Sequence, residues 1–115
     1  MRPYNASRSK YGNRKTVYDG IEFDSRKEAL RYRDLKLLLH AGEINDLELQ
    51  VHFELVPAQN WGERKERAVE YVADFVYRDK TGNKVVEDVK GYRAKEYIIK
   101  RKLMKHLHGI EIREV

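Results

Sequence analysis

The chain has 115 residues, a length typical of a single domain with one hydrophobic core. It contains no Cys, which excludes a disulfide framework, a thiolate zinc site and a cysteine nucleophile. No apolar run approaches the roughly 20 residues of a membrane-spanning helix, and the first residues lack the apolar stretch of a signal peptide. We therefore expect a soluble, cytoplasmic protein without a membrane partner.

The net charge of +5 arises in the first 15 residues. This segment has no acid and five basic residues, whereas residues 16–115 hold 19 basic and 19 acidic residues. The pattern predicts a flexible, disordered basic arm (residues 1–15) in front of a single neutral domain (residues 16–115). A basic arm is typical of proteins that bind a polyanion, most often nucleic acid, although a solubilising tail has the same composition.

The first half of the domain is predicted to contain a hairpin, a helix and a strand. Thr16–Phe23 has the pattern of a small hairpin that turns at Asp19-Gly20. A helix is expected over Ser25–Ala41, ended by Gly42. In Leu47–Val56 every second residue is apolar, which predicts a strand with one buried face. Residues 57–67 are predicted to form a polar loop, in which Trp61 is either a loop anchor or a base-stacking wedge.

The second half is predicted to contain two strands, a helix and a last strand. The strands Val69–Arg78 and Lys84–Lys90 flank a turn at Asp79–Asn83. The helix, about Ala94–His108, is ended by Gly109, and Ile110–Val115 forms the last strand. The core order of helix, three strands, helix and strand predicts an α/β protein.

Glu28 interrupts an otherwise apolar helical stripe. It shares the stripe with Tyr32, Leu35 and Leu39 and lies at its N-terminal end. Ser25-Arg26-Lys27-Glu28 matches a capping box, in which Glu28 would satisfy the backbone N–H of Ser25. The alternative is a functional acid that faces a cleft from the first turn of the helix.

Two further acids, Asp74 and Asp88, lie on predicted strands where Asp is disfavoured. A three-residue loop, Lys80-Thr81-Gly82, with Gly in the left-handed position would pair Asp79 with Asn83. In that register Asp74 falls directly opposite Asp88. Facing carboxylates repel each other, so they need a nearby positive charge.

Two sources of positive charge are consistent with the pattern. Lys90 lies on the same strand face as Asp88, and a simple structural Asp–Lys pair would leave the other acid at the sheet edge. A hard divalent cation would neutralise both acids, since Mg²⁺ prefers carboxylate oxygens together with water and a substrate phosphate.

Asp74, followed by Asp88-Val89-Lys90, resembles the signature of the PD-(D/E)XK nuclease superfamily. The element order resembles the restriction-endonuclease-like core of that superfamily, and Glu28 stands where its first-helix acid lies. Residues 18–115 also resemble a group of small phage and prophage proteins assigned to it. The matching segments are residues 19–25, 47–50, 71–75 and 87–91, and one departure is Ala73 in place of the Pro in the superfamily name.

The resemblance implies a role for each matching residue. Asp74, Asp88 and the Val89 carbonyl would bind Mg²⁺ or Mn²⁺, and Glu28 would hold the metal or its water shell. Lys90 would orient or activate the attacking water. Gln50, on the polar face of its strand, and Tyr97, on the second helix, are candidates to line the cleft.

The segment from Lys90 to Lys105 holds seven basic residues and one acid. Ile99, Leu103 and Leu107, with Met104 beside them, are predicted to form the buried stripe of this helix. Its basic face is either ordinary solvated surface or a phosphate-binding surface. The residues expected to bind DNA, from the arm and from this segment, are Arg8, Lys10, Arg14, Lys15, Arg93, Lys95, Lys100 and Arg101.

The leading hypothesis is a metal-dependent DNA endonuclease of phage or prophage origin that acts in the bacterial host cell during recombination or replication. Its small size and basic arm favour selectivity for branched DNA, as in a Holliday-junction resolvase. Symmetric cleavage of a junction requires two sites, which a C2 homodimer supplies. The alternative is a non-catalytic nucleic-acid-binding module on a nuclease fold.

Overall fold

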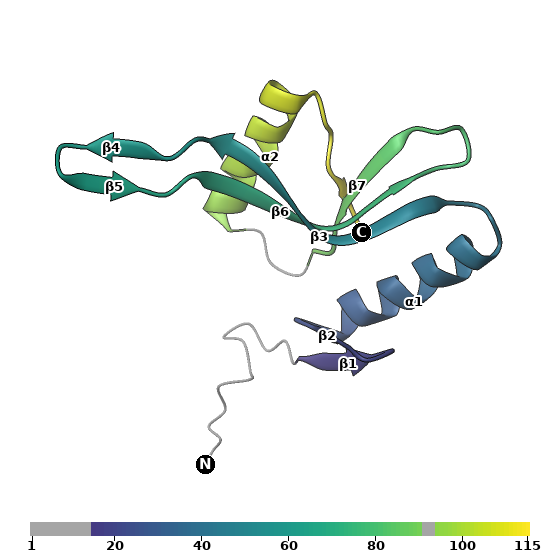
Figure 1. The fold of residues 1–115 in the computed structure, drawn as a ribbon. Helices are drawn as coiled ribbons and strands as arrows, with labels where there is room; N and C mark the ends of the chain where they lie inside the picture. The colour runs from purple at the N-terminus through teal and green to yellow at the C-terminus, as the bar shows by residue number, and fades with distance from the viewer. Residues whose placement is uncertain (1–14, 91–93) are drawn as a thin grey trace, which may run out of the picture. The chain divides into compact units, whose positions relative to one another are not determined.

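The computed structural model describes residues 15–90 and 94–115, which form a mixed α/β protein (Figure 1). The chain divides into two compact units, Met1–Ile44 and Asn45–Val115, and each is described by itself. The expectation of a single domain over residues 16–115 stays a prediction. None of the helices in the described ranges is long and apolar enough to cross a membrane.

The first unit consists of a short hairpin and a helix. Strands β1 (Thr16–Tyr18) and β2 (Ile21–Phe23) are antiparallel and are joined by Asp19 and Gly20, both with positive φ. Helix α1 (Arg26–His40) begins after Ser25, whose side chain accepts a hydrogen bond from the backbone N–H of Glu28 at 3.1 Å. The predicted hairpin and helix are confirmed. The buried face of α1 comprises Glu28, Ala29, Tyr32 and Leu35.

The second unit contains a four-stranded mixed sheet. Its strands are β3 (Asn45–Val56), β6 (Val69–Arg78), β7 (Lys84–Asp88) and β8 (Arg113–Glu114), in the order β3-β6-β7-β8. β3, β6 and β7 pair antiparallel, whereas β8 runs parallel to β7. Helix α2 (Lys95–His108) connects β7 to β8, because parallel neighbours need a crossover connection.

Residues 57–67 form a second hairpin, so the predicted loop is wrong. Strands β4 (Gln59–Trp61) and β5 (Arg64–Glu66) pair antiparallel beyond the ends of β3 and β6. The turn contains Gly62 with φ of 66°. The segment has no alternation of apolar and polar residues because every residue of both strands is exposed, so the usual strand signal is missing.

The predicted register between β6 and β7 is confirmed. Their pairs run from Arg78–Lys84 to Phe75–Glu87. The turn is held by Asp79, whose carboxylate accepts hydrogen bonds from the backbone N–H groups of Thr81 and Asn83 and from the Thr81 hydroxyl. These bonds lower the pKa of Asp79 and fix the turn that sets the register.

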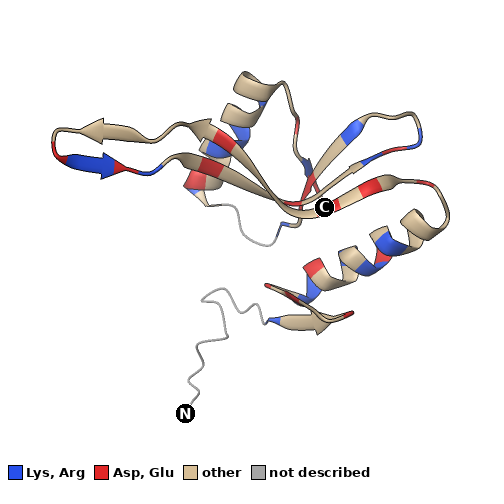
Figure 2. Ribbon diagram, viewed as in Figure 1, with Lys and Arg blue, Asp and Glu red and all other residues tan. Residues whose placement is uncertain are grey.

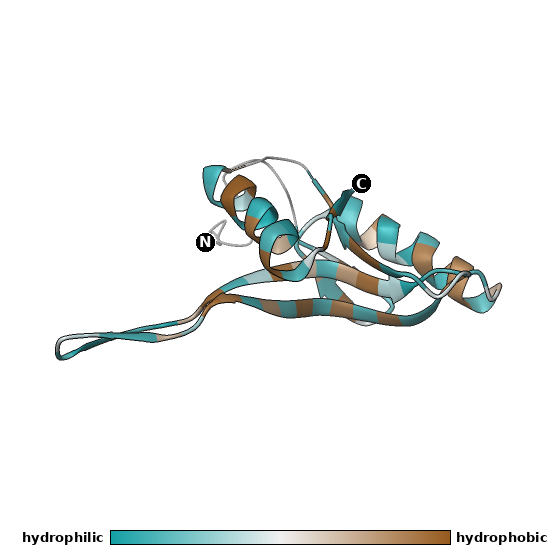
Figure 3. Ribbon diagram, turned by 90° about the horizontal axis from the view of Figure 1, so that it is seen from above, coloured by the Kyte–Doolittle hydropathy of each residue, from teal (hydrophilic) through white to brown (hydrophobic). Residues whose placement is uncertain are grey.

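The core of the second unit lies between α2 and the sheet. It contains Leu55, Tyr71, Ala73, Val76, Val86 and Met104. The predicted buried stripe of α2 is wrong for Ile99 and Leu107, which are 58% and 49% exposed. It is confirmed for Met104, which is fully buried, and for Leu103, which packs against the core. Arg101 bonds Glu114 of β8, and His108 bonds the Glu54 carbonyl of β3. Two polar side chains therefore lie on the side of α2 toward the sheet, which an apolar pattern cannot predict. The apolar stretches of β3 and β6 are visible as brown segments in Figure 3.

Truncation of Met104 should destabilise the protein much more than truncation of Leu107 on the same helix. Met104→Ala leaves a cavity in the core, and we expect a loss of about 2–5 kcal/mol in the free energy of unfolding. Leu107→Ala, at a half-exposed position, should cost less than half of that. Urea denaturation measures both values; equal losses would contradict the observed orientation of α2.

Candidate active site

The site begins where β7 separates from β6. After the pair Phe75–Glu87, the next step of the register brings Asp74 to the level of Asp88. Here a side chain makes the contact between the strands: the backbone N–H of Val89 donates to Asp74 Oδ2 at 2.8 Å. The carboxylate of Asp74 is thereby fixed at the end of β7.

Strand β8 contacts the end of β7 on the side opposite β6. Asp88 pairs with Glu114 in the parallel β7–β8 ladder. The Val115 N–H donates to the Asp88 carbonyl at 3.1 Å, and the Lys90 N–H donates to the Val115 carbonyl at 3.0 Å. Asp88-Val89-Lys90 is therefore held between Asp74 on one side and β8 on the other.

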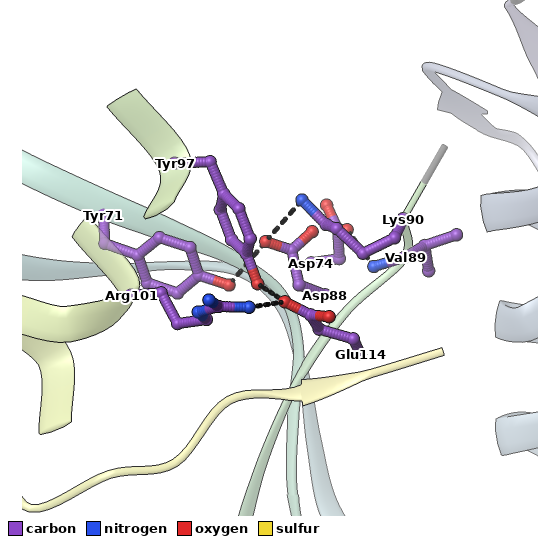
Figure 4. Close-up of polar contacts among 8 residues, drawn as sticks. All are labelled: Tyr71, Asp74, Asp88, Val89, Lys90, Tyr97, Arg101 and Glu114. Carbon is purple, nitrogen blue, oxygen red and sulfur yellow. Dashed lines mark hydrogen bonds and ion pairs between the residues drawn. The ribbon is translucent and has the colours of Figure 1, made fainter. Parts of the chain in front are cut away.

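Lys90 lies between an acid and an aromatic ring. Its Nζ is 3.3 Å from Asp88 Oδ2 and 3.4 Å from the centroid of the Tyr97 ring. The same Asp88 oxygen accepts a hydrogen bond from the Tyr71 hydroxyl at 2.8 Å. Figure 4 shows the carboxylates of Asp74 and Asp88 and the ammonium of Lys90 pointing into one region, bordered by the two tyrosines.

A second set of contacts positions Tyr97. Its hydroxyl donates to Glu114 Oε2 at 2.7 Å, and Arg101 Nη1 donates to the same oxygen at 2.9 Å. Because the Tyr97 ring contacts the Lys90 ammonium, Glu114 and Arg101 act on the lysine indirectly through this ring (Figure 4).

A pocket of about 360 Å³ opens beside Asp88, between β6 and the first turns of α2. It is lined by Glu70, Tyr71, Val72, Asp88, Ala94, Glu96, Tyr97 and Lys100. Tyr97 and Lys100, both expected from the sequence, thus share one pocket with Asp88. An open space next to an acid–lysine pair can admit a ligand.

Burial favours the neutral form of three tyrosines in the second unit. It is the largest cause of a raised pKa at Tyr71, Tyr77 and Tyr97, and the neighbouring carboxylates Asp88, Glu87 and Glu114 act in the same direction. A neutral phenol donates a hydrogen bond to an acid without adding charge.

Tyr71 was missed in the sequence because the strand is irregular at Asp74. Ala73 and Val76 pack in the same core cluster, although residues three apart in a regular strand point to opposite faces. On the neighbouring strand β3, Gln50 has a positive φ of 52°. Gln50 lies between Leu49, which pairs with Phe75, and Val51, which pairs with Ala73. The irregularity brings Tyr71 to the face of Asp88. The sequence shows no signal of it.

Glu114 was also missed. Glu114 reaches the site only through the parallel pairing of β8, whose register the sequence does not show. Glu87 points to the opposite face of β7, as strand alternation predicts, and there it is fully buried and accepts a hydrogen bond from Tyr77. Arg113 lies 3.9 Å from the same carboxylate.

The other predicted residues lie in several different places. Glu28 belongs to the first unit, so its part in the site stays a prediction. Lys15 forms an exposed ion pair with Asp24 at 2.9 Å, Lys95 is exposed at the start of α2, and Arg101 binds Glu114. The remaining residues expected to bind DNA lie outside the described residues: Arg8, Lys10, Arg14 and Arg93.

The site residues carry oxygen atoms, which are the ligand type that a hard divalent cation prefers. Two carboxylates, Asp74 and Asp88, and the Val89 carbonyl offer oxygen ligands, and Mg²⁺ commonly takes one or two carboxylates and keeps several waters. Within residues 15–90 and 94–115, no group of three or more His, Cys, Asp or Glu side chains is arranged to hold a metal ion. Two acids plus a carbonyl satisfy the minimum for Mg²⁺, so the donor set fits.

The fold and the site define an α/β protein that brings two acids and a lysine together where two strands separate. The chain belongs to the family described as "Protein of unknown function (DUF1064)", whose model matches residues 8–113. No curated protein matches the chain.

Tyr71, Tyr77 and Tyr97 should ionise later than ordinary tyrosines. Their raised pKa values mean that the stability they contribute is fully present below about pH 10, the ordinary tyrosine pKa, and is lost as the pH rises through the folded values. A phenolate absorbance titration of the native protein should show at least three of the eight tyrosines ionising late. In denaturant all eight should ionise together near pH 10; the same behaviour in the native protein would contradict the prediction.

Proposed function

We propose that this protein is a metal-dependent DNA endonuclease with a restriction-endonuclease-like core. The observation that supports the proposal is that Asp74 of β6 contacts the end of β7 at Val89, where Asp88 and Lys90 form an ion pair. Hydrolysis of a phosphodiester bond needs a cation near the phosphate and an oriented water, and these residues can supply both.

Each residue has a distinct task in this proposal. Asp74, Asp88 and the Val89 carbonyl would hold Mg²⁺ or Mn²⁺. A bound divalent ion polarises a phosphoryl oxygen and lowers the pKa of a bound water. Lys90 orients the attacking water and offsets the charge of the scissile phosphate. The Tyr97 ring and Asp88 restrict the lysine to the position from which it can do so.

Helix α2 offers a phosphate-binding surface next to these acids. Lys100 lines the pocket beside Asp88. A second hollow of about 470 Å³, lined by Arg101, Lys102, Lys105, His106, Glu111 and Ile112, lies on the same helix. Figure 2 shows the blue segments of α2 in the second unit. A DNA backbone that crosses this surface would run past the acids, and its affinity would fall with salt.

The expected substrate is branched DNA, such as a Holliday junction in phage or prophage recombination. Cleavage of two strands at a junction favours a C2 homodimer with one site in each protomer.

One observation favours a second candidate, a nucleic-acid-binding module without catalysis. Lys90 already forms an ion pair with Asp88, and such a pair neutralises one acid without a metal. The buried pair would then be structural, and the basic surface of α2 would serve binding alone.

The decisive experiment measures cleavage of four-way-junction, flap and linear duplex DNA with Mg²⁺, Mn²⁺ or EDTA. We expect metal-dependent cleavage, fastest on branched DNA, that Asp74→Asn and Asp88→Asn lower by about 1,000-fold or more. Lys90→Met should lower it by about 100-fold or more. Glu54→Gln, which removes an exposed carboxylate of β3 outside the pocket, is the matched control and should cleave normally.

DNA binding by these variants separates the two candidates. Retained binding with lost cleavage in the Asp74 and Asp88 variants supports the enzyme. Binding without cleavage of any substrate by the unmodified protein would leave only the binding module.

Divalent cations should bind the protein in the absence of DNA. Titration calorimetry with Mn²⁺ should detect binding to the unmodified protein and to Glu54→Gln, and Asp74→Asn and Asp88→Asn should each weaken it by about tenfold or more. Lys90→Met should strengthen it, because the lysine competes with the metal for Asp88. Identical Mn²⁺ affinity in all variants would exclude these acids as ligands.

A further inference from the structure

The hairpin β4–β5 extends from the ends of β3 and β6, away from α2 and the rest of the sheet (Figure 1). All residues of both strands are exposed. Trp61, next to the turn, is 62% exposed, so it does not anchor a loop to the core. A large aromatic side chain on a projecting hairpin is placed to contact another molecule.

Trp61 lies beside a second planar group. It pairs directly with Arg64 across the hairpin, so the indole and the guanidinium share one face. On the same face the indole Nε1 donates to Gln59 Oε1 at 3.0 Å, and Arg64 Nη2 donates to Glu66 Oε2 at 3.2 Å. Each planar group is thus oriented by the residue two positions away on its own strand.

The charge of the hairpin favours an anionic partner with planar groups. Residues 59–67 hold three basic residues (Arg64, Lys65 and Arg67) and two acids, and the basic ones gather on and after β5 (Figure 2). The residues beside Trp61 on β4 are polar rather than apolar, and Figure 3 shows the end of the hairpin in hydrophilic colours. An apolar protein partner would find no further apolar contact here. An indole and a guanidinium beside Lys and Arg match a nucleobase next to phosphates.

We infer that the β4–β5 hairpin binds unpaired nucleobases, which stack on Trp61 and Arg64. This inference rests on the proposed DNA substrate and specifies which kind of DNA it is. The substrate would contain unpaired or unstacked bases, as single strands, gaps and open branch points do. The hairpin would recognise the structure of the substrate, and the acids at the end of β7 would act on it.

Trp61 is the only tryptophan of the chain, so its intrinsic fluorescence reports on this residue alone. The full-length protein is titrated in EDTA with an oligo(dT) strand, with a gapped four-way junction and with a blunt duplex. We expect strong quenching by oligo(dT) and by the gapped junction, at concentrations at which the duplex quenches little. Because EDTA prevents cleavage, this readout does not depend on catalysis.

Variants test the contribution of each planar group by fluorescence anisotropy of labelled oligo(dT). Trp61→Leu should weaken binding about tenfold or more, and Trp61→Phe should retain most of the affinity because it keeps an aromatic face. Arg64→Lys, which keeps the charge and removes the planar group, should weaken binding severalfold. Asn60→Ala, on the other face of β4, is the matched control and should bind within about twofold of the unmodified protein.

Three results would overturn the inference: no quenching by any DNA, equal quenching by duplex and oligo(dT), or equal oligo(dT) affinity for Trp61→Leu and the unmodified protein. Trp61 fluorescence that changes with protein concentration in the absence of DNA would instead assign the hairpin to contact between copies of the chain. Quenching without cleavage in Mg²⁺ would retain the hairpin inference and reject the endonuclease. Cleavage without quenching would retain the endonuclease and reject the hairpin inference.

Discussion

The arrangement of the candidate site depends on the change of partner along β7. Up to Glu87 the strand pairs with β6, and from there its backbone pairs with β8. In the opening between β6 and β7, the Val89 N–H bonds the side chain of Asp74 rather than a backbone carbonyl. A carboxylate thus takes the place of a ladder bond, and this substitution brings two acids from neighbouring strands to one point. Every proposed role of Asp88 and Lys90 follows from it.

Uncharged donors limit the electrostatic cost of this cluster. Tyr71 donates to Asp88 and Tyr97 donates to Glu114, and burial keeps both phenols protonated. Lys90 supplies the positive charge, and the ring of Tyr97 stabilises its ammonium. The cluster therefore combines two cations, Lys90 and Arg101, with neutral phenol donors.

Local signals in the sequence predicted much of the fold. The turn chemistry of residues 79–83 gave the β6–β7 register, and periodicity gave α1 and β3. Features that depend on distant parts of the chain were not predictable. Tyr71 reaches Asp88 only because β6 is irregular at Asp74, and Glu114 arrives through a parallel pairing. The orientation of α2 depends on polar contacts of Arg101 and His108, and the hairpin β4–β5 has no apolar pattern at all.

The parallel pairing of β7 with β8 has a consequence for the order of folding. The β6–β7 hairpin is local and can form early, but β8 can join β7 only after the chain has passed through the whole of α2. Tyr97, which restrains Lys90, lies on this same crossover helix. The lysine therefore gains the restraint of the Tyr97 ring only in the step in which α2 packs on the sheet. A chain that stops before that step has the sheet and its acids, but not the geometry that makes them a site.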